Sequence, residues 1–369
     1  MRICHLTSVH SHNDTRIFIK ECRFLARNGF DVHYIVPNAP HENVDGICLH
    51  GVSSSSKNRL LRMTITVFDV YKKALEIDAD VYHFHDPELI PVGLILKFRE
   101  KKVIYDVHED VPRQIMSKDW IPKPYRKIVS WIFERIENWA SKRFDGIVVA
   151  TPFITRRFKR LQENVINVNN YPLLDELFSE ELERHHPTYD KYVCYIGGIS
   201  KVRGIVEMVQ AVAKTDAKLL LGGNFSNSQL RHQLTNMSEW KNVVELGFLN
   251  REQVKDTLRK AVAGLVVFHP EPNHINAQPN KMFEYMSAGI PVIASNFPLW
   301  KEIVEGNECG ICVNPLDPDE IAQAIQYILD NPKVAKKMGE NGRKAVEEKY
   351  NWETESKKLV QFYNEIIKN

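Results

Sequence analysis

Short apolar runs of strand length alternate along this chain with longer segments whose apolar residues recur at helical spacing. In the first half the strand-like runs are 1–6, 32–36, 81–84, 102–105, 146–150 and 165–168. Helical patterns separate them at 16–27, 60–77, 89–98, 123–143 and 152–160. Apolar strands joined through helices are typical of a parallel sheet covered on both faces. The first half therefore predicts a doubly wound α/β domain.

A second alternation follows a polar, charged stretch at 173–190. Its strand-like runs are 192–196, 218–221, 243–246, 263–268, 292–294 and 311–313, and its helical patterns are 205–213, 229–237, 253–260 and 321–329, before a helical end at 334–348 and 352–367. The predicted fold class is α/β, with two doubly wound Rossmann-like domains facing a cleft. We expect the first domain at 1–175, the second at 176–350, and a last helix at 351–369 that crosses back to the first.

Size and charge narrow the function classes. A chain of 369 residues is too long for one ordinary core, and its net charge of +2 does not argue for a nucleic-acid partner. No apolar run is long enough to span a bilayer, and the N-terminus lacks the charged start and apolar core of a signal peptide. We expect a cytoplasmic protein.

The stretch 273–291 is the strongest candidate for chemistry, because it joins two strand-like runs through a polar loop and a short helix. Pro279 suits the first turn of that helix, and Gly289 suits the position after its end. The free N–H groups and the dipole of an exposed helix N-terminus favour an anion such as phosphate. Asn276 and Glu284 would then border one pocket.

A glycine turn after the first strand of the second domain forms a second candidate. Gly197 and Gly198 allow the backbone to approach a phosphate closely, and Arg203 can supply a bidentate cationic clamp. Such turns are often plain connections between a strand and a helix. This one is expected at the same sheet edge as the 273–291 loop, so two anion-suited helix starts would share one rim.

Polar clusters also follow strands of the first domain, at 83–88, 106–110 and 10–16. His83, His85 and Asp86 with Asp106 and His108 would suit zinc or iron, whereas Asp86 can equally begin a helix. His108 is the better functional candidate, because it ends a strand beside an acidic loop. The donors and acceptors of 10–16 suit a polyhydroxylated ligand, although Asn13 or Asp14 can simply cap the next helix.

Bulky apolar residues alternate with lysines and arginines over 120–143, beginning at Trp120. A helix of this kind can rest on an anionic membrane surface. It can also be a core helix with a solvated basic face, and both interpretations stay open.

Taken together, these residues resemble the family 4 retaining glycosyltransferases of GT-B fold across nearly the whole chain. The match is best over 279–294, which resembles the signature helix and following strand of that family. His12 to Phe18 and Tyr105 to Glu109 resemble loops of the branch that assembles bacterial surface polysaccharides, such as capsule and O-antigen.

The resemblance implies roles for individual residues. Glu284 would bind the ribose of a sugar nucleotide, Arg203 its diphosphate and His108 the transferred sugar. Asn276 stands where the family often has a first glutamate, and Gly198 stands where it usually has an arginine, so Lys281 is expected to supply the second cation. The remaining expected contacts are Gly197, Gly198, Gln278, Pro279 and Asn280 for the donor, and Asn13, Asp14, Arg16, Asp86 and Glu109 for the acceptor.

The implied reaction is transfer of a hexose or N-acetylhexosamine, with retention, from a nucleotide-diphosphate sugar, expected to be UDP-linked. The acceptor would be a hydroxyl of a lipid-diphosphate-linked or other glycan, which attacks from the front face as the diphosphate departs. Positioning and charge stabilisation dominate such a step. We expect no cofactor and no metal, since no convincing Asp-x-Asp motif ends a strand.

Three alternatives remain open. A sugar-nucleotide epimerase of related fold would act on the donor without an acceptor. A non-catalytic subunit would bind the sugar nucleotide without turnover, because Asn276 breaks the acidic pair. A metal-dependent hydrolase would lose activity to a chelator.

Overall fold

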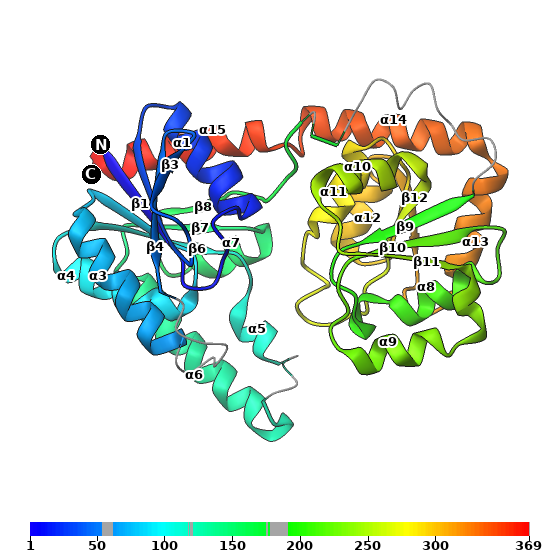
Figure 1. Cartoon of the computed structure of the whole chain (residues 1–369), viewed down its shortest axis with the longest axis horizontal. Coiled ribbons are helices and arrows are strands. Elements are labelled where there is room, and N and C mark those ends of the chain that lie inside the picture. The colour runs from blue at the N-terminus through cyan, green and yellow to red at the C-terminus, as the bar shows by residue number, and fades with distance from the viewer. Residues whose placement is uncertain (54–61, 117, 119–120, 175, 178–190, 369) are drawn as a thin grey trace. The chain divides into compact units, whose positions relative to one another are not determined.

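The computed structural model describes residues 1–53, 62–116, 118, 121–174, 176–177 and 191–368 (Figure 1). The chain divides into two compact units. Unit 1 comprises Met1–Asn170 together with Trp352–Asn369, and unit 2 comprises Tyr171–Asn351. The first division thus falls between Asn170 and Tyr171 and not at 175. Most of the polar connection expected at 173–190 lies outside the described residues.

Unit 1 is built on an eight-stranded sheet of order β3-β4-β2-β1-β5-β6-β7-β8. The strands are β1 Arg2–Leu6, β2 Asp31–Pro37, β3 Glu42–Val44, β4 Ile47–Val52, β5 Val81–Phe84, β6 Lys102–Val107, β7 Gly146–Val149 and β8 Val165–Asn167. All neighbours are parallel except β3 and β4. The helical segments are η1 Thr15–Cys22 (π-type), α1 Arg23–Arg27, η2 Arg62–Thr66, α3 Val67–Ile77, η3 Pro87–Leu89, α4 Ile90–Phe98, α5 Val111–Ile115, α6 Lys123–Ser141, α7 Pro152–Phe158 and α15 Trp352–Lys368.

The hairpin of β3 and β4 was not predicted. Asp45 and Gly46 form its turn with φ angles of 54° and 80°. Two consecutive residues at positive φ suit the tight turn that matches the twist of a hairpin, and Asp-Gly is a preferred pair for it. This dipeptide was the available signal, because β3 has only three residues and gives no apolar run.

The last helix, α15, belongs to unit 1. It packs against β7 at Gly146, where an added Cβ would lie 2.3 Å from a side-chain carbon of Ile366 and 2.6 Å from one of Phe362. Glu355, near its start, accepts the backbone N–H of Asn169 at 2.8 Å. The fully buried Tyr363 reaches the centre of the sheet. The end of the chain is therefore part of the core of unit 1.

Unit 2 is built on a six-stranded sheet of order β11-β10-β9-β12-β13-β14, in which all neighbours are parallel. The strands are β9 Tyr192–Ile196, β10 Lys218–Gly222, β11 Val243–Gly247, β12 Ala261–Val266, β13 Val292–Ser295 and β14 Gly310–Val313. The helical segments are η5 Lys201–Arg203, α8 Ile205–Val212, α9 Ser228–Thr235, η6 Ser238–Asn242, α10 Arg251–Lys260, α11 Asn280–Ser287, α12 Pro298–Val304, α13 Pro318–Asp330 and α14 Pro332–Glu348. The prediction of two doubly wound parallel sheets is confirmed.

Strand order reverses once in each sheet. The chain winds outward from β1 through β2 and then outward from β5 in the other direction, so unit 1 reverses between β1 and β5. Unit 2 reverses between β9 and β12. In open α/β sheets ligands bind beyond the carboxyl ends of the strands at such reversals, because the flanking loops leave to opposite faces. Each unit therefore has one expected binding edge.

Candidate functional site

The binding edge of unit 2 begins with the glycine loop after β9. Gly197 and Gly204 have φ angles of 131° and 77°, where residues with a side chain are strained. A Cβ on Gly204 would also lie 1.9 Å from the carbonyl oxygen of Val267, at the end of the neighbouring strand. The turn into α8 is thus packed directly against the loop that follows β12.

Arg203 folds back over this glycine loop. Its Nη1 donates to the carbonyl oxygen of Gly198 at 3.1 Å, and a Cβ on Gly198 would lie 2.6 Å from the same nitrogen. The absence of a side chain at position 198 is what makes room for the guanidinium. The guanidinium of Arg203 thus lies directly against position 198.

Lys281 approaches the same loop from the first turn of α11, where a Cβ on Gly197 would lie 2.9 Å from its Nζ. Its Nζ lies 3.6 Å from the ring centroid of Tyr195 and 5.3 Å from that of Phe268, over which Arg203 also lies. The side chain is 9% exposed, and Nζ has no hydrogen-bond partner among the described residues. Burial and then the positive charge of Arg203 hold the Lys281 pKa well below its ordinary value. Lys281 and Arg203 thus lie near one another, and no carboxylate bonds to the Lys281 ammonium among the described residues. Such a pair of basic groups favours the binding of an anion.

Helix α11 has the ends that the sequence predicts, shifted by one residue at its start. Pro279 immediately precedes the helix and provides no side-chain cap. Gly289 has φ 74°, its N–H donates to the Met286 carbonyl, and the Ile290 N–H donates to the Tyr285 carbonyl. These two bonds form a Schellman motif, which ends the helix at the predicted glycine.

Glu284, expected to bind ribose, is held by an arginine that sequence reasoning missed. Arg251 Nη1 donates to Glu284 Oε1 at 2.8 Å, and Arg251 Nε donates to Glu176 Oε1 at 2.7 Å. Arg251 lies at the start of α10, after β11, and nothing in its local sequence marks it as a partner for α11. The pair orients the carboxylate while leaving part of it accessible to solvent.

The loop before α11 is fixed from behind. Trp300 Nε1 donates to the Ala277 carbonyl at 2.7 Å, and His274 Nδ1 lies 3.1 Å from the His269 carbonyl oxygen. Gln278 Oε1 is buried and accepts no hydrogen bond from the described residues. Asn276, beside it, is half-buried. An unsatisfied amide oxygen at the donor edge fits a predicted donor contact, since a buried acceptor without a donor is costly.

At the binding edge of unit 1, His108 follows β6 and is oriented from below. Its Nε2 lies 2.9 Å from Asp106 Oδ2 and 3.1 Å from His85 Nδ1. Asp106 is fully buried. Burial raises the pKa of Asp106, but Arg16 and then His108 outweigh it and hold that pKa well below its ordinary value. His108 is 19% exposed, so it presents an accessible imidazole fixed by a buried carboxylate.

His10 joins the same edge, and sequence reasoning did not single it out from its polar loop. Its ring centroid lies 5.5 Å from that of His108, its Nδ1 lies 3.0 Å from Asp14 Oδ2, and its Nε2 lies 3.5 Å from Asp86 Oδ1. Burial lowers the His10 pKa, but the bond to Asp14 and the charge of Asp86 outweigh burial and raise it. The edge thus carries two imidazoles side by side.

The residues expected to contact the acceptor differ in how exposed they are to solvent. Asn13 and Glu109 are exposed. Asp14 caps η1 by accepting the N–H groups of Arg16 and Ile17, so the capping interpretation is confirmed for it. Asp86 is buried and accepts Thr7 Oγ1 at 2.6 Å and the Ser8 N–H at 2.7 Å.

Arg16 lies beneath this edge instead of on it. It is 4% exposed, and its guanidinium donates to both Asp106 oxygens and to the Val168 carbonyl. These bonds neutralise the buried carboxylate that orients His108. The geometry therefore gives Arg16 a positioning part and leaves it little surface for an acceptor.

Two family models match the chain. The model described as "Glycosyl transferases group 1" matches residues 179–345, and that described as "Glycosyltransferase Family 4" matches 16–168. An uncharacterized glycosyltransferase of Methanocaldococcus jannaschii is 28% identical, covering 92% of this chain and 90% of that protein.

Solved structures share the fold over their whole length. Sucrose-phosphate synthase from Thermosynechococcus elongatus has a TM-score of 0.80 at 19% identity, over 99% of this chain and 98% of that one. HepE from Anabaena, in complex with UDP, has a TM-score of 0.74 at 15% identity, over 99% and 100%. With two consecutive family models covering both sheets, this chain belongs to the family 4 glycosyltransferases of GT-B fold.

Proposed function

We propose that the protein transfers a hexose or N-acetylhexosamine from a UDP-linked donor to a glycan hydroxyl, with retention at the anomeric carbon. The observation that carries the proposal is the pair of Lys281 and Arg203, two basic side chains that lie against neighbouring glycines of one loop, at Gly197 and Gly198. HepE, which shares the fold, binds UDP. A diphosphate supplies the negative charge that this pair lacks.

Binding of the diphosphate would raise the pKa of Lys281 again. A bound dianion favours the protonated ammonium, and both cations then face the charge that develops on the departing diphosphate. The leaving phosphate takes the proton of the acceptor hydroxyl, so transfer needs no metal and no cofactor. Asn276 and Gln278 hydrogen-bond the donor at the same edge, and Glu284 accepts ribose hydroxyls while Arg251 holds its carboxylate in place.

Unit 1 would supply the sugar and acceptor contacts. His108, oriented by Asp106, contacts the transferred sugar, and the exposed groups Asn13 and Glu109 with His10 contact the acceptor. An imidazole that is already held in place can stabilise the transition state without having to reorient during the reaction. In this proposal His10 contacts the acceptor in place of Arg16, which is buried.

A thermal-shift screen tests donor recognition. UDP and UDP-glucose should raise the Tm of the full chain, by the equivalent of about 2.7 kcal/mol when the ligand is at 100 times its Kd, and UMP should raise it much less because it lacks the second phosphate. The Arg203→Ala variant should lose most of the UDP shift. Arg231→Ala, which removes an exposed arginine paired with Glu245 in the same unit, is the matched control and should keep it. Failure of every nucleoside diphosphate to raise the Tm would refute the donor site.

Product analysis separates transfer from the alternatives. With UDP-sugar and an acceptor, NMR of the product should show the anomeric configuration of the donor. An inverted product would contradict retention. Incubation of the donor alone should leave the sugar unchanged, whereas an epimerase would convert it, and a non-catalytic subunit would bind UDP yet yield no product with any acceptor.

We further propose that the acceptor is lipid-linked and that α6 brings the enzyme to it at an anionic membrane surface, from the cytoplasmic side. One face of α6 carries large exposed apolar side chains: Tyr125, Ile128, Trp131, Ile132, Ile136 and Trp139. Exposed cations flank them: Lys123, Lys127, Arg135, Lys142 and Arg143. The two acids of the helix face inward, where Glu134 pairs with Arg113 and the buried Glu137 pairs with Arg157. Aromatic residues among cations suit the interface of an anionic bilayer.

No described helix is both long enough and apolar enough to cross a membrane, so α6 would lie on the surface. Trp120, where the predicted segment began, lies outside the described residues. Vesicles containing 30% phosphatidylglycerol should bind the chain in a salt-sensitive way. Trp131→Glu with Trp139→Glu should weaken binding by a factor of about 10² to 10³, since each aromatic residue contributes about 2 kcal/mol on burial and each 1.4 kcal/mol is about tenfold. Phe248→Glu, at a 74% exposed position of unit 2, is the control. Equal binding by all three proteins would contradict the membrane proposal.

A further inference from the structure

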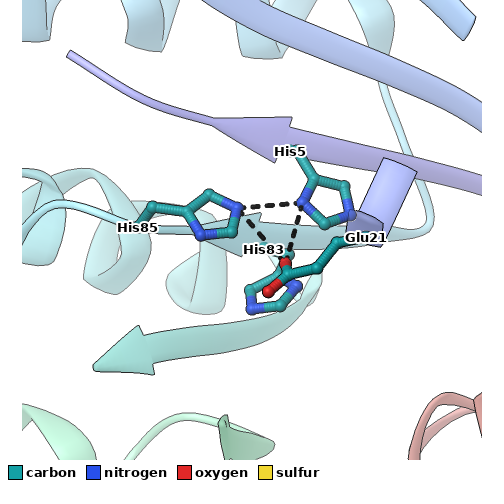
Figure 2. Close-up of side chains that lie close together, drawn as sticks. All are labelled: His5, Glu21, His83 and His85. Atoms are coloured by element: carbon teal, nitrogen blue, oxygen red, sulfur yellow. Dashed lines mark hydrogen bonds and ion pairs between the residues drawn. The ribbon is translucent and has the colours of Figure 1, made fainter. Parts of the chain in front are cut away.

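Beneath the His108 edge, three histidines and one glutamate converge in the interior of unit 1 (Figure 2). His5 lies on β1, its register partner His83 lies on β5, His85 follows β5, and Glu21 comes from η1. Their exposed fractions are between 0 and 3%. We call these four residues the histidine cluster. It is separate from the proposed diphosphate site, which lies in unit 2.

Three ligand atoms of the cluster surround one point. His5 Nδ1 and His85 Nε2 are 2.9 Å apart, and Glu21 Oε2 lies 3.9 Å from the first and 4.0 Å from the second. In a triangle with these sides, the point equidistant from the corners lies about 2.1 Å from each, which matches the Zn–N and Zn–O distances of protein sites. One ligand atom of His83 lies within 4.8 Å of the other three, which makes His83 the candidate fourth ligand.

In each of the three imidazoles, the ring nitrogen that does not face the proposed metal position already has a polar neighbour. His85 Nδ1 lies 3.2 Å from Asp106 Oδ2, His83 Nδ1 lies 2.7 Å from Tyr363 Oη, and His5 Nε2 lies 3.4 Å from the same phenol oxygen. Metal-bound histidines characteristically donate their other ring N–H to a carboxylate or another acceptor, which fixes the tautomer and the ring orientation. The nitrogens that remain, His5 Nδ1, His85 Nε2 and His83 Nε2, are those that a metal requires.

A simple hydrogen-bond network leaves part of the cluster unsatisfied. A bond between His5 and His85 uses one nitrogen of each. Both Glu21 oxygens and His83 Nε2 are then without a hydrogen bond in the described part of the chain, although Arg16 Nε forms an ion pair with Glu21 Oε1 at 3.1 Å. Buried polar atoms without a partner are rare, and a bound water or ion is one arrangement that satisfies them.

We propose that His5, His83, His85 and Glu21 bind one divalent metal ion of the zinc class. Zinc accepts imidazole and carboxylate ligands, and a closed four-coordinate arrangement is that of a structural zinc site. Because the four ligands are buried, the ion cannot touch a diphosphate or a sugar. It would instead tie β1, β5 and η1 together, and Tyr363 would connect α15 to it.

Metal content is the direct test. The full-length chain, made without a histidine tag in medium containing Zn²⁺, should carry about one ion per chain when measured by elemental mass spectrometry. Grown with Co²⁺, it should show the intense visible absorption of a four-coordinate cobalt site. Refolding in the presence of Zn²⁺ should give a higher Tm than refolding with chelator, because the ion binds only the folded state.

Variants locate the ion. Glu21→Gln and His83→Gln should each contain less than about a tenth of an ion per chain, and Tyr363→Phe should keep the ligands but bind zinc about tenfold more weakly. His50→Gln is the matched control. This substitution removes one member of a second stacked histidine pair on the same sheet, in which His33 Nδ1 lies 2.8 Å from His50 Nε2. The variant should still contain about one metal ion per chain.

The proposal is overturned by a parent chain that contains no metal and gains no Tm from Zn²⁺ or Co²⁺ on refolding. It is equally overturned by ion content that falls in His50→Gln and stays in Glu21→Gln and His83→Gln. The parent measurement decides the matter even where a variant does not fold. Both readouts are independent of transferase activity.

Discussion

Replacing Lys281 with methionine is expected to abolish stabilisation by UDP while leaving the nucleotide-free protein as stable as the parent or more stable. In the free protein the ammonium is buried without a hydrogen-bond partner near Arg203, so it opposes folding. Methionine fills a similar volume without a charge. The Tm without ligand should therefore be unchanged or a few degrees higher, corresponding to about 1 kcal/mol or more.

The same substitution should lower kcat by a factor of about 10² to 10³, the usual effect of removing one preorganised group that stabilises developing negative charge. Initial rates with saturating donor and the Tm with and without UDP are the measurements. Lys260→Met, at an exposed lysine ending α10 in the same unit, is the control and should change neither. Unaltered turnover in Lys281→Met would remove the lysine from the mechanism, whatever its effect on stability.

The metal-free protein is expected to lose stability steeply in mild acid, through unit 1. Burial lowers the pKa of His5, His83 and His85, in the case of His85 to about 4. Below about pH 6.5 these three histidines bind protons in the unfolded chain but resist protonation in the folded chain. The free energy of unfolding therefore falls as pH falls. Burial and then Asp106 raise the Glu21 pKa, which acts in the opposite direction to the three histidines.

Burial likewise lowers the pKa of His33 and His50, whereas the bond to Asp14 and the charge of Asp86 raise that of His10. The lowered histidine pKa values outnumber the raised one, so unit 1 should lose stability as pH falls below about 6.5. Hydrogen exchange of peptides from β1 and β5, measured with chelator from pH 7.5 to 5, should show this loss, with β9 and β10 of unit 2 as the internal reference. His83→Gln should reduce the slope. His232→Gln, on the exposed face of α9, should leave it unchanged. A slope equal in both units would contradict the prediction.

Most of the secondary structure was predictable because it depends on neighbouring residues. The apolar runs of β1, β5, β9 and β13 predict strands at almost their observed bounds, and Gly289 ends α11 as its flexibility allows. The glycine loop and the signature helix were likewise recognisable, since positive φ and helix ends require particular residues at particular positions. The same local rules missed the β3–β4 hairpin, where only the Asp-Gly pair carried a signal.

The site itself was predictable in part. Arg203 and Lys281 stand out as cations near helix starts, but only the sheet order brings them to the same two glycines. From the sequence, Arg16 is an arginine in a polar loop. In the structure it lies beneath the binding edge and pairs with Asp106, because a buried carboxylate is costly unless a cation neutralises it. Arg251 carries no local sign of its bond to Glu284.

By itself, then, the sequence determined where the strands, the helices and the anion-suited turns lie, and the resemblance that assigns the chain to its family. The tertiary structure alone decided which charges meet: Lys281 with Arg203, and His5 with His85, Glu21 and, through Tyr363, the last helix. Local conformation depends on residues within a few positions of each other. Charge pairing and burial depend on groups distant in the chain, which only the order of parallel strands brings together.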